Sequence, residues 1–151
     1  MPYKKTLERA KRDRRQGKSA STQAGEFVRE EIEEIRAGKH GARSAKQAIA
    51  IGLSKARRAG VKLPAPAKGK TSDETRRKAQ QDLKRGSSAA RTTVSRKRSQ
   101  ATIRALKREG QAAASKVALS RQARSAAKKR TRAERSASAK KAARTRTRRG
   151  K

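Results

Sequence analysis

The chain of 151 residues carries 46 Lys and Arg residues against 12 Asp and Glu residues, a formal net charge of +34. Only 31% of the residues are hydrophobic and 1% are aromatic, and the absence of cysteine excludes disulfides, thiol chemistry and thiolate metal sites. Low hydrophobicity combined with extreme charge is typical of chains that remain disordered alone. We therefore expect an all-α fold: a small αα-hairpin module with largely disordered or conditionally helical basic arms.

Residues 1–24 are predicted to form a basic N-terminal arm. They contain eight Lys and Arg residues, and a helix is expected over residues 4–16, where Gly17 interrupts the pattern. The basic start is not followed by the apolar run of a secretory signal, and no stretch reaches the ~18 apolar residues of a membrane-spanning helix. We therefore predict a location in the cytoplasm at the nucleoid, and no membrane partner.

Residues 25–63 hold the chain's main predicted packing surface, a helical hairpin. The apolar side of its first helix consists of Phe27, Val28, Ile32 and Ile35. Glu26, Glu30 and Glu31 are expected in the early turns of this helix, where the positive end of the helix dipole favours carboxylates. Gly38 is expected to end it.

The second helix of the hairpin is expected from Ser44 to Gly60. Ser44 and Gln47 have the spacing of a capping box. Gly60 suits the left-handed residue that closes a helix, and Val61 can fold back onto Ala56. An apolar stripe follows helical spacing along its length: Ala45, Ala48, Ile49, Gly52, Leu53 and Ala56.

The two helices are predicted to pack through a small core. Phe27, Ile32 and Ile35 would meet Ile49 and Leu53 across the hairpin, and small residues at Ala45, Ala48 and Gly52 would let the backbones approach closely. Because two helices bury little apolar surface, the hairpin is also a candidate homodimer interface.

The segment GKHGARSAKQAIAIGLSKARRAGVKLP, residues 38–64, resembles the central block of a group of small, very basic bacterial proteins of unknown function. Some of these proteins are loosely described as DNA-binding. The resemblance is closest over residues 46–60. It implies that this block is the defining module and that the tails vary, and it brings no catalytic residue and no established partner.

Residues 64–71 are predicted to be a Pro/Gly linker, stiffened by Pro64 and Pro66 and made flexible by Gly69.

The remainder, residues 72–151, is an Ala/Lys/Arg-rich basic tail with three predicted helical segments. The first is capped by Thr71 or Ser72 and runs through residue 85. The second covers about 88–109, and the third starts at 111. The glycines expected to close helices are Gly38, Gly60, Gly86 and Gly110. Because they are spaced almost regularly, a decayed helical repeat is a weaker alternative interpretation of the chain.

The gradient of charge is the main functional signal. From Lys84 onward the chain has 24 basic residues and two acidic ones. The final stretch resembles the tails of linker histones and bacterial nucleoid proteins, which implies binding along phosphates with release of condensed counterions. The predicted nucleic-acid-binding residues are Arg43, Lys46, Lys55, Arg57, Arg58, Lys128, Lys129, Arg130, Arg132, Lys140, Lys141, Arg144, Arg146, Arg148 and Arg149.

The sequence predicts no catalytic residue, no cofactor and no metal site. His40 is the only histidine and lies between small residues in a predicted loop, with no second His or Cys to complete a metal site. The acidic cluster Glu30, Glu31, Glu33 and Glu34 is interpreted as a set of intramolecular partners for Arg29, Arg36 and the basic second helix. No nucleophile, base and orienting group assemble into a site, so enzyme activity is not expected.

Nucleic-acid binding without sequence preference is therefore the predicted function, most simply duplex DNA binding by a nucleoid-associated or compacting protein. The near absence of aromatic residues removes the stacking platforms that many single-strand binders use. An RNA- or ribosome-associated basic protein is the alternative. A polycation that binds anionic lipid is weaker, because its interfacial helix would need Trp, Phe or Leu on one face.

Overall fold

The computed structural model describes residues 2–88 and 95–149. Its α-helices are α1 (Lys4–Arg15), α2 (Ala20–Arg36), α3 (Ala45–Arg58), α4 (Asp73–Ser87), α5 (Arg96–Lys107), α6 (Lys116–Lys128) and α7 (Arg132–Arg149), with a short 3₁₀ helix, η1, at Ala112–Ala114. The described residues form no β-strand. The chain divides into two compact units, Met1–Ser115 and Lys116–Lys151.

The expectation of largely disordered arms around one hairpin is wrong. The predicted arms are helical throughout most of their described length, and the first unit packs α1, α2, α3, α4 and η1 together rather than a hairpin alone. The average composition of the whole chain predicted too much disorder, because the few apolar residues are concentrated where helices pack against one another. The predicted helix from about residue 88 falls partly on residues 89–94, which lie outside the described part of the chain.

Helix α1 belongs to the packed unit, although the sequence indicated an arm. Ala10 is buried in one cluster with Phe27 and Ala56, and Leu7 packs against that cluster. The helix ends one residue before its predicted end. Gly17 closes it with a φ of +67°, and the backbone N–H of Lys18 donates to the carbonyl of Asp13.

Helix α2 begins six residues earlier than the acidic cluster suggested. Ser19 is its N-cap, and its hydroxyl accepts a hydrogen bond from the Thr22 N–H at 3.3 Å. The glutamates therefore lie in the middle and later turns, and the helix-dipole explanation of their positions is wrong. Basic partners on neighbouring helices explain them instead: Arg9 of α1 pairs with Glu26, and Lys55 of α3 pairs with Glu30 and Glu31.

Helix α3 follows its predicted caps closely. The Ser44 hydroxyl accepts from the Gln47 N–H at 3.2 Å, whereas the Gln47 side chain accepts from the Arg43 N–H, one residue before the expected partner. Gly60 has a φ of +90°, and the Val61 N–H donates to the Ala56 carbonyl at 3.1 Å. This pair of features closes the helix as predicted.

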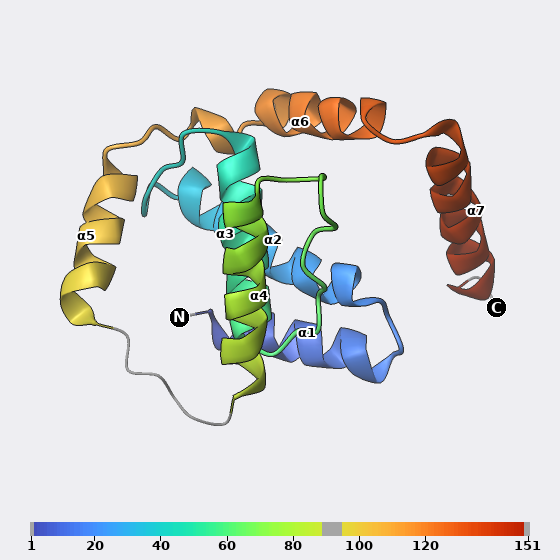
Figure 1. Cartoon of the computed structure of the whole chain (residues 1–151), viewed down its shortest axis with the longest axis horizontal. Coiled ribbons are helices and arrows are strands. Elements are labelled where there is room, and N and C mark those ends of the chain that lie inside the picture. Colours follow the sequence, from blue (N-terminus) through green and yellow to red (C-terminus); the bar gives the residue numbers. More distant parts are fainter. Residues whose placement is uncertain (1, 89–94, 150–151) are drawn as a thin grey trace. The chain divides into compact units, whose positions relative to one another are not determined.

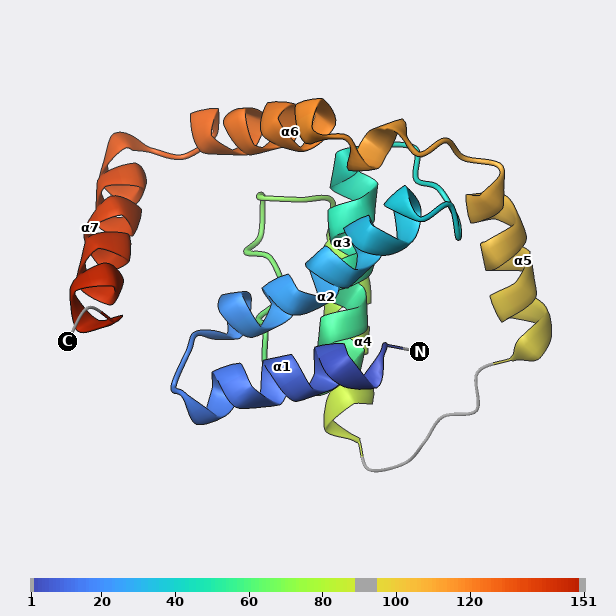
Figure 2. The same cartoon turned by 180° about the vertical axis from the view of Figure 1, so that it is seen from behind.

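Helix α3 lies between α2 on one side and α4 on the other (Figures 1 and 2). Except for Arg57, its buried residues are alanine and glycine. The helix α2 therefore approaches closely: a Cβ on Gly52 would lie 2.6 Å from the Val28 Cα. The larger Ile49 and Leu53, expected at the centre of the core, are only partly buried. Phe27 and Ile35, in contrast, are fully buried as expected.

Helix α4 is capped by Ser72, one of the two predicted caps, whose hydroxyl accepts from the Thr75 N–H. Gly86 does not end this helix in the left-handed conformation. It lies within α4, where glycine is required because a Cβ would lie 1.9 Å from the Arg57 carbonyl oxygen. Gly110 also lacks a positive φ, so Gly38 and Gly60 are the only two of the four predicted closing glycines that act as such.

The segment after α5 folds back over the loop between α2 and α3. The Gly41 N–H donates to the Leu106 carbonyl at 2.9 Å and the Ala42 N–H donates to the Gly110 carbonyl at 3.1 Å. Arg36 donates through Nε to the Ala114 carbonyl. We call residues 106–114 the clasp, because these bonds hold the loop at residues 38–43.

The second unit consists of α6 and α7. The predicted continuous segment after residue 111 is thus divided into η1, α6 and α7. A capping box starts α7: the Thr131 N–H donates to Glu134 Oε2 at 2.8 Å, and the Glu134 N–H donates to Thr131 Oγ1 at 3.2 Å.

Candidate nucleic-acid interface

Most acidic side chains of the first unit are engaged by basic partners within the same unit. Ion pairs join Asp13 to Lys18, Glu26 to Arg9, Glu33 to Arg29, Glu74 to Lys78, Asp82 to Arg58 and Glu109 to Arg43. Several of these pairs are exposed and contribute little to stability. Their consequence is electrostatic, because the acidic side chains are held beside basic ones instead of standing alone on the surface.

The largest group of acidic residues surrounds one lysine. Lys55 Nζ lies 2.7 Å from Glu31 Oε2, 2.7 Å from Glu34 Oε2 and 3.7 Å from Glu30 Oε1. Burial alone would lower the pKa of Lys55, but its contacts with Glu31 and Glu34 outweigh burial and raise it. The interpretation of these glutamates as intramolecular partners of the second helix is confirmed.

Two of the predicted interface residues are therefore turned inward. Lys55 is occupied by the glutamates, and only 19% of its side chain is exposed. Arg57 is buried, which lowers its pKa, and it donates to the carbonyls of Leu63 and Pro64. Both side chains stabilise the first unit, and neither is available to phosphates.

The remaining predicted residues of the first unit are on the surface. Arg43 is 82% exposed and lies 3.7 Å from Glu109, Lys46 is exposed on α3, and Arg58 is 45% exposed beside Asp82. Because Arg43 and Arg58 each lie beside a carboxylate, part of their charge is offset within the first unit.

The predicted residues of the second unit are all exposed where described: Lys128, Lys129, Arg130, Arg132, Lys140, Lys141, Arg144, Arg146 and Arg148. The side chain of Arg149 lies outside the described part. Every described side chain of α7 is exposed, and basic residues occur on all sides of this helix. A helix of this kind has no face with which to join a protein core.

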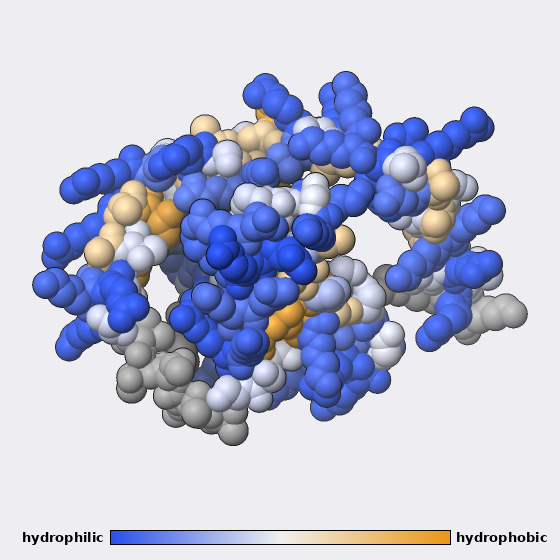
Figure 3. All heavy atoms as spheres, viewed as in Figure 1, coloured by the Kyte–Doolittle hydropathy of each residue, from blue (hydrophilic) through white to orange (hydrophobic). Residues whose placement is uncertain are grey.

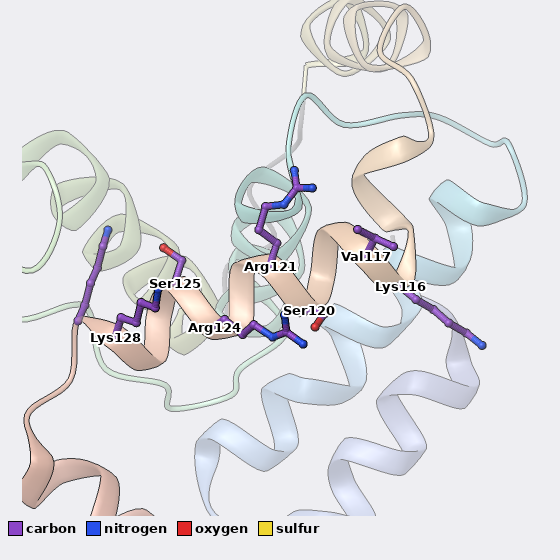
Figure 4. A pocket seen from close by; sticks show the side chains of 8 residues that line it. Lys116, Val117, Ser120, Arg121, Arg124, Ser125 and Lys128 are labelled. Atoms are coloured by element: carbon purple, nitrogen blue, oxygen red, sulfur yellow. The ribbon is translucent and has the colours of Figure 1, made fainter.

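One face of α6 forms a shallow hollow that sequence reasoning missed. It is lined by Lys116, Val117, Ser120, Arg121, Arg124, Ser125, Lys128 and Lys129. Figure 4 shows Lys116, Arg121, Arg124 and Lys128 projecting from this helix. Lys128 and Lys129 were predicted to bind nucleic acid, whereas Lys116, Arg121 and Arg124 were not. Basic residues recur every three to five positions from Lys116 to Lys128, and that near-helical spacing is the signal in the sequence that indicates a shared face.

Hydrophilic residues cover most of the face seen in Figure 3, with small apolar patches between them. The exposed large apolar residues of the described chain are Tyr3, Ile103 and Val117, which are far apart in sequence. None of the described helices combines the length and hydropathy needed to cross a bilayer.

Comparison with known proteins gives a partial similarity. Residues 3–68 match a family of unknown function (DUF6496). The matched segment contains α1, α2 and α3, so it starts before the module predicted over residues 25–63. No curated protein and no solved structure matches the chain.

Proposed function

We propose that this protein binds duplex DNA without sequence preference, through phosphate contacts made mainly by α6 and α7. The observation that carries this proposal is α7 itself, an 18-residue helix with every described side chain exposed and basic residues on all sides. Residues 116–151 contain 15 basic residues and one acidic residue. A polyanion is the partner whose charge matches such a surface.

The dimensions of α7 suit a duplex. An 18-residue helix is ~27 Å long at 1.5 Å per residue. Duplex DNA presents about one negative charge per 1.7 Å of axis, so the helix spans more phosphates than it has basic side chains. Arg also forms bidentate contacts with phosphate, which favours an Arg-rich surface for this role.

The chain offers little aromatic surface for stacking the bases of single strands. It has one Phe, one Tyr and no Trp. Phe27 is 1% exposed, and Tyr3, which is 44% exposed, has the Lys39 Nζ 4.7 Å from its ring centroid. Single-strand binders commonly rely on exposed aromatic residues, so the surface favours a duplex.

The proposal places the protein at the nucleoid, in the cytoplasm, and assigns it neither a catalytic activity nor a cofactor. It includes no homodimer, because α1 and α4 pack against the two helices of the hairpin within the same chain. In this proposal the first unit contains the folded core of the chain, and the second unit supplies most of the phosphate contacts.

The experiment that tests the proposal is a competition titration in which fluorescence anisotropy reports how much labelled duplex remains bound. A labelled duplex of about three helical turns, ~30 base pairs, is displaced by an unrelated duplex, by a single strand and by structured RNA, at matched phosphate concentration and salt. The two duplexes should compete almost equally, and the single strand should compete less well. Stronger competition by structured RNA than by either duplex would replace the DNA assignment with RNA binding, and a large preference for one duplex would show base readout.

A further inference from the structure

The buried glutamates and the loop after α2 bring three potential metal ligands together. Glu31, Glu34 and His40 each offer a ligand atom, and these atoms all lie within 4.8 Å of one another. Two come from successive turns of α2 and the third from the loop held by the clasp. We propose that Glu31, Glu34 and His40 bind a divalent first-row transition metal, of which Zn²⁺ is the representative probe.

Glu31 provides the first independent observation. Its side chain is fully buried, and neither carboxylate oxygen has a hydrogen-bond partner of good geometry. Oε2 lies beside Lys55, whereas Oε1 lies on the side of His40, with 3.5 Å between Oε1 and Nε2. A buried carboxylate oxygen left without a hydrogen bond is costly, and coordination of a cation would satisfy it.

His40 is held in the orientation that metal-binding histidines adopt. Its Nδ1 lies 3.1 Å from the Gly41 carbonyl oxygen, and the tautomer with its proton on Nδ1 would donate to that oxygen. In that tautomer the Nε2 lone pair faces Glu31 and Glu34, at 3.5 and 3.8 Å from their oxygens. Histidine ligands typically donate their second ring N–H to a backbone carbonyl in the same way.

The charge of the cluster favours a second cation. Three carboxylates, from Glu30, Glu31 and Glu34, surround the ammonium of Lys55. Together these four side chains carry a formal excess of two negative charges in a largely buried space, where uncompensated charge is expensive. The ammonium of Lys39 acts on Glu34 and Glu30 only from the exposed surface. A divalent cation supplies the charge that is lacking.

Lys55 is a competitor for this site. Its Nζ lies 2.7 Å from oxygens of both proposed carboxylate ligands, so a metal would displace it from at least one of them. Its flexible stem and partly exposed side chain allow the ammonium to move outward. Glu34 and His40, with 15% and 14% of their side chains exposed, leave a route by which an ion enters.

One imidazole nitrogen and two carboxylate oxygens form a donor set that Zn²⁺ accepts, with a fourth position for water. Background binding elsewhere is limited because His40 is the only histidine, cysteine is absent and the net charge is +34. A site that binds metal in this chain is therefore straightforward to locate by mutation.

The test uses the untagged full-length chain without nucleic acid. Co²⁺ is titrated while its visible absorption is recorded, and Zn²⁺ is then added to displace it. The variants are His40→Gln and Glu34→Gln. Glu33→Gln is the matched control, because Glu33 is an exposed glutamate on the same helix that pairs with Arg29. Circular dichroism confirms that each variant is folded.

We expect one Co²⁺ per chain with an absorption typical of low coordination number, displaced by Zn²⁺. His40→Gln and Glu34→Gln should each weaken binding at least about 10-fold, the smallest loss seen when even an outer partner of a ligand is removed. Glu33→Gln should leave the affinity unchanged. The proposal would be overturned if no Co²⁺ absorption appeared. It would also be overturned if all four proteins bound Co²⁺ with equal affinity, because the metal would then be an adventitious ion only.

A second measurement follows thermal unfolding with and without Zn²⁺. A ligand that binds only the folded state raises the unfolding temperature, and tighter binding raises it further. Zn²⁺ should raise it more in Lys55→Met than in the wild type, because the competing ammonium is gone. A rise produced equally by Mg²⁺ and Zn²⁺, or retained in His40→Gln, would contradict a site that includes the imidazole.

Discussion

Gly52 of α3 lies directly against the backbone of Val28 in α2. A Cβ at position 52 would lie 2.6 Å from the Val28 Cα and 3.0 Å from its backbone nitrogen. Backbone atoms cannot move aside as the end of a flexible side chain can. The close approach of α2 and α3 therefore requires glycine at this position.

Gly52→Ala should destabilise the first unit, although alanine is the better helix former. The favourable change in helix propensity is about 1 kcal/mol, whereas overpacking typically costs about 1–3 kcal/mol and separates the two helices. Urea unfolding followed by circular dichroism measures the change. The matched control is Gly25→Ala in α2, where a Cβ would meet nothing within 4 Å. The control should increase stability, and an increase in both variants would show that α2 and α3 pack more loosely than described.

Lys55 is expected to contribute strongly to stability through the glutamates around it. Lys55→Met leaves three carboxylates without their ammonium partner, and removing one partner of a buried ion pair typically costs about 3–5 kcal/mol. Unfolding should be measured in chelator so that metal does not compensate. Lys46→Met, an exposed position on the same helix, should change stability little. Similar destabilisation by both substitutions would contradict a special role for Lys55.

Local signals in the sequence predicted the ends of several helices. Ser44, Gly38 and Gly60 act as expected because capping depends on neighbours a few residues away. The predicted start of α2 was wrong because it was placed from the acidic cluster, whereas the capping residue is Ser19.

Features that depend on tertiary contacts could not be predicted. Composition gives no indication that Leu7 and Ala10 join the core, or that Lys55 and Arg57 turn inward on a basic helix. His40 was dismissed as a metal ligand because no other His or Cys was present, while carboxylates from the second half of α2 became its neighbours in the fold.

The clasp depends on glycine at position 41. A Cβ there would lie 1.9 Å from the Glu109 carbonyl oxygen, so Gly41→Ala should open the clasp. Amide hydrogen exchange should show reduced protection at Ala42, whose N–H is bonded to the Gly110 carbonyl. Gly110→Ala is the control, because a Cβ there meets nothing within 4 Å. Unchanged protection in Gly41→Ala would mean that the clasp is not closed in solution.

The salt dependence of duplex binding shows whether α7 supplies the phosphate contacts. Lys140, Lys141, Arg144 and Arg148 are exposed and, at 3.6 residues per turn, lie on one face of α7. A variant with glutamine at these four positions is compared with one carrying glutamine at Lys4, Lys11, Arg14 and Arg15, four exposed basic residues on one face of α1. Both variants have the same reduction in charge, so any difference between them reports where phosphates bind.

The slope of log affinity against log salt decreases in magnitude by about 0.9 for each phosphate that the protein no longer neutralises. If phosphates bind mainly to the second unit, the slope should decrease in magnitude by about 3–4 in the α7 variant and by less than about 1 in the α1 variant. An equal decrease in both variants would show that affinity follows net charge alone. An unchanged slope in the α7 variant would contradict the assignment of phosphate binding to the second unit.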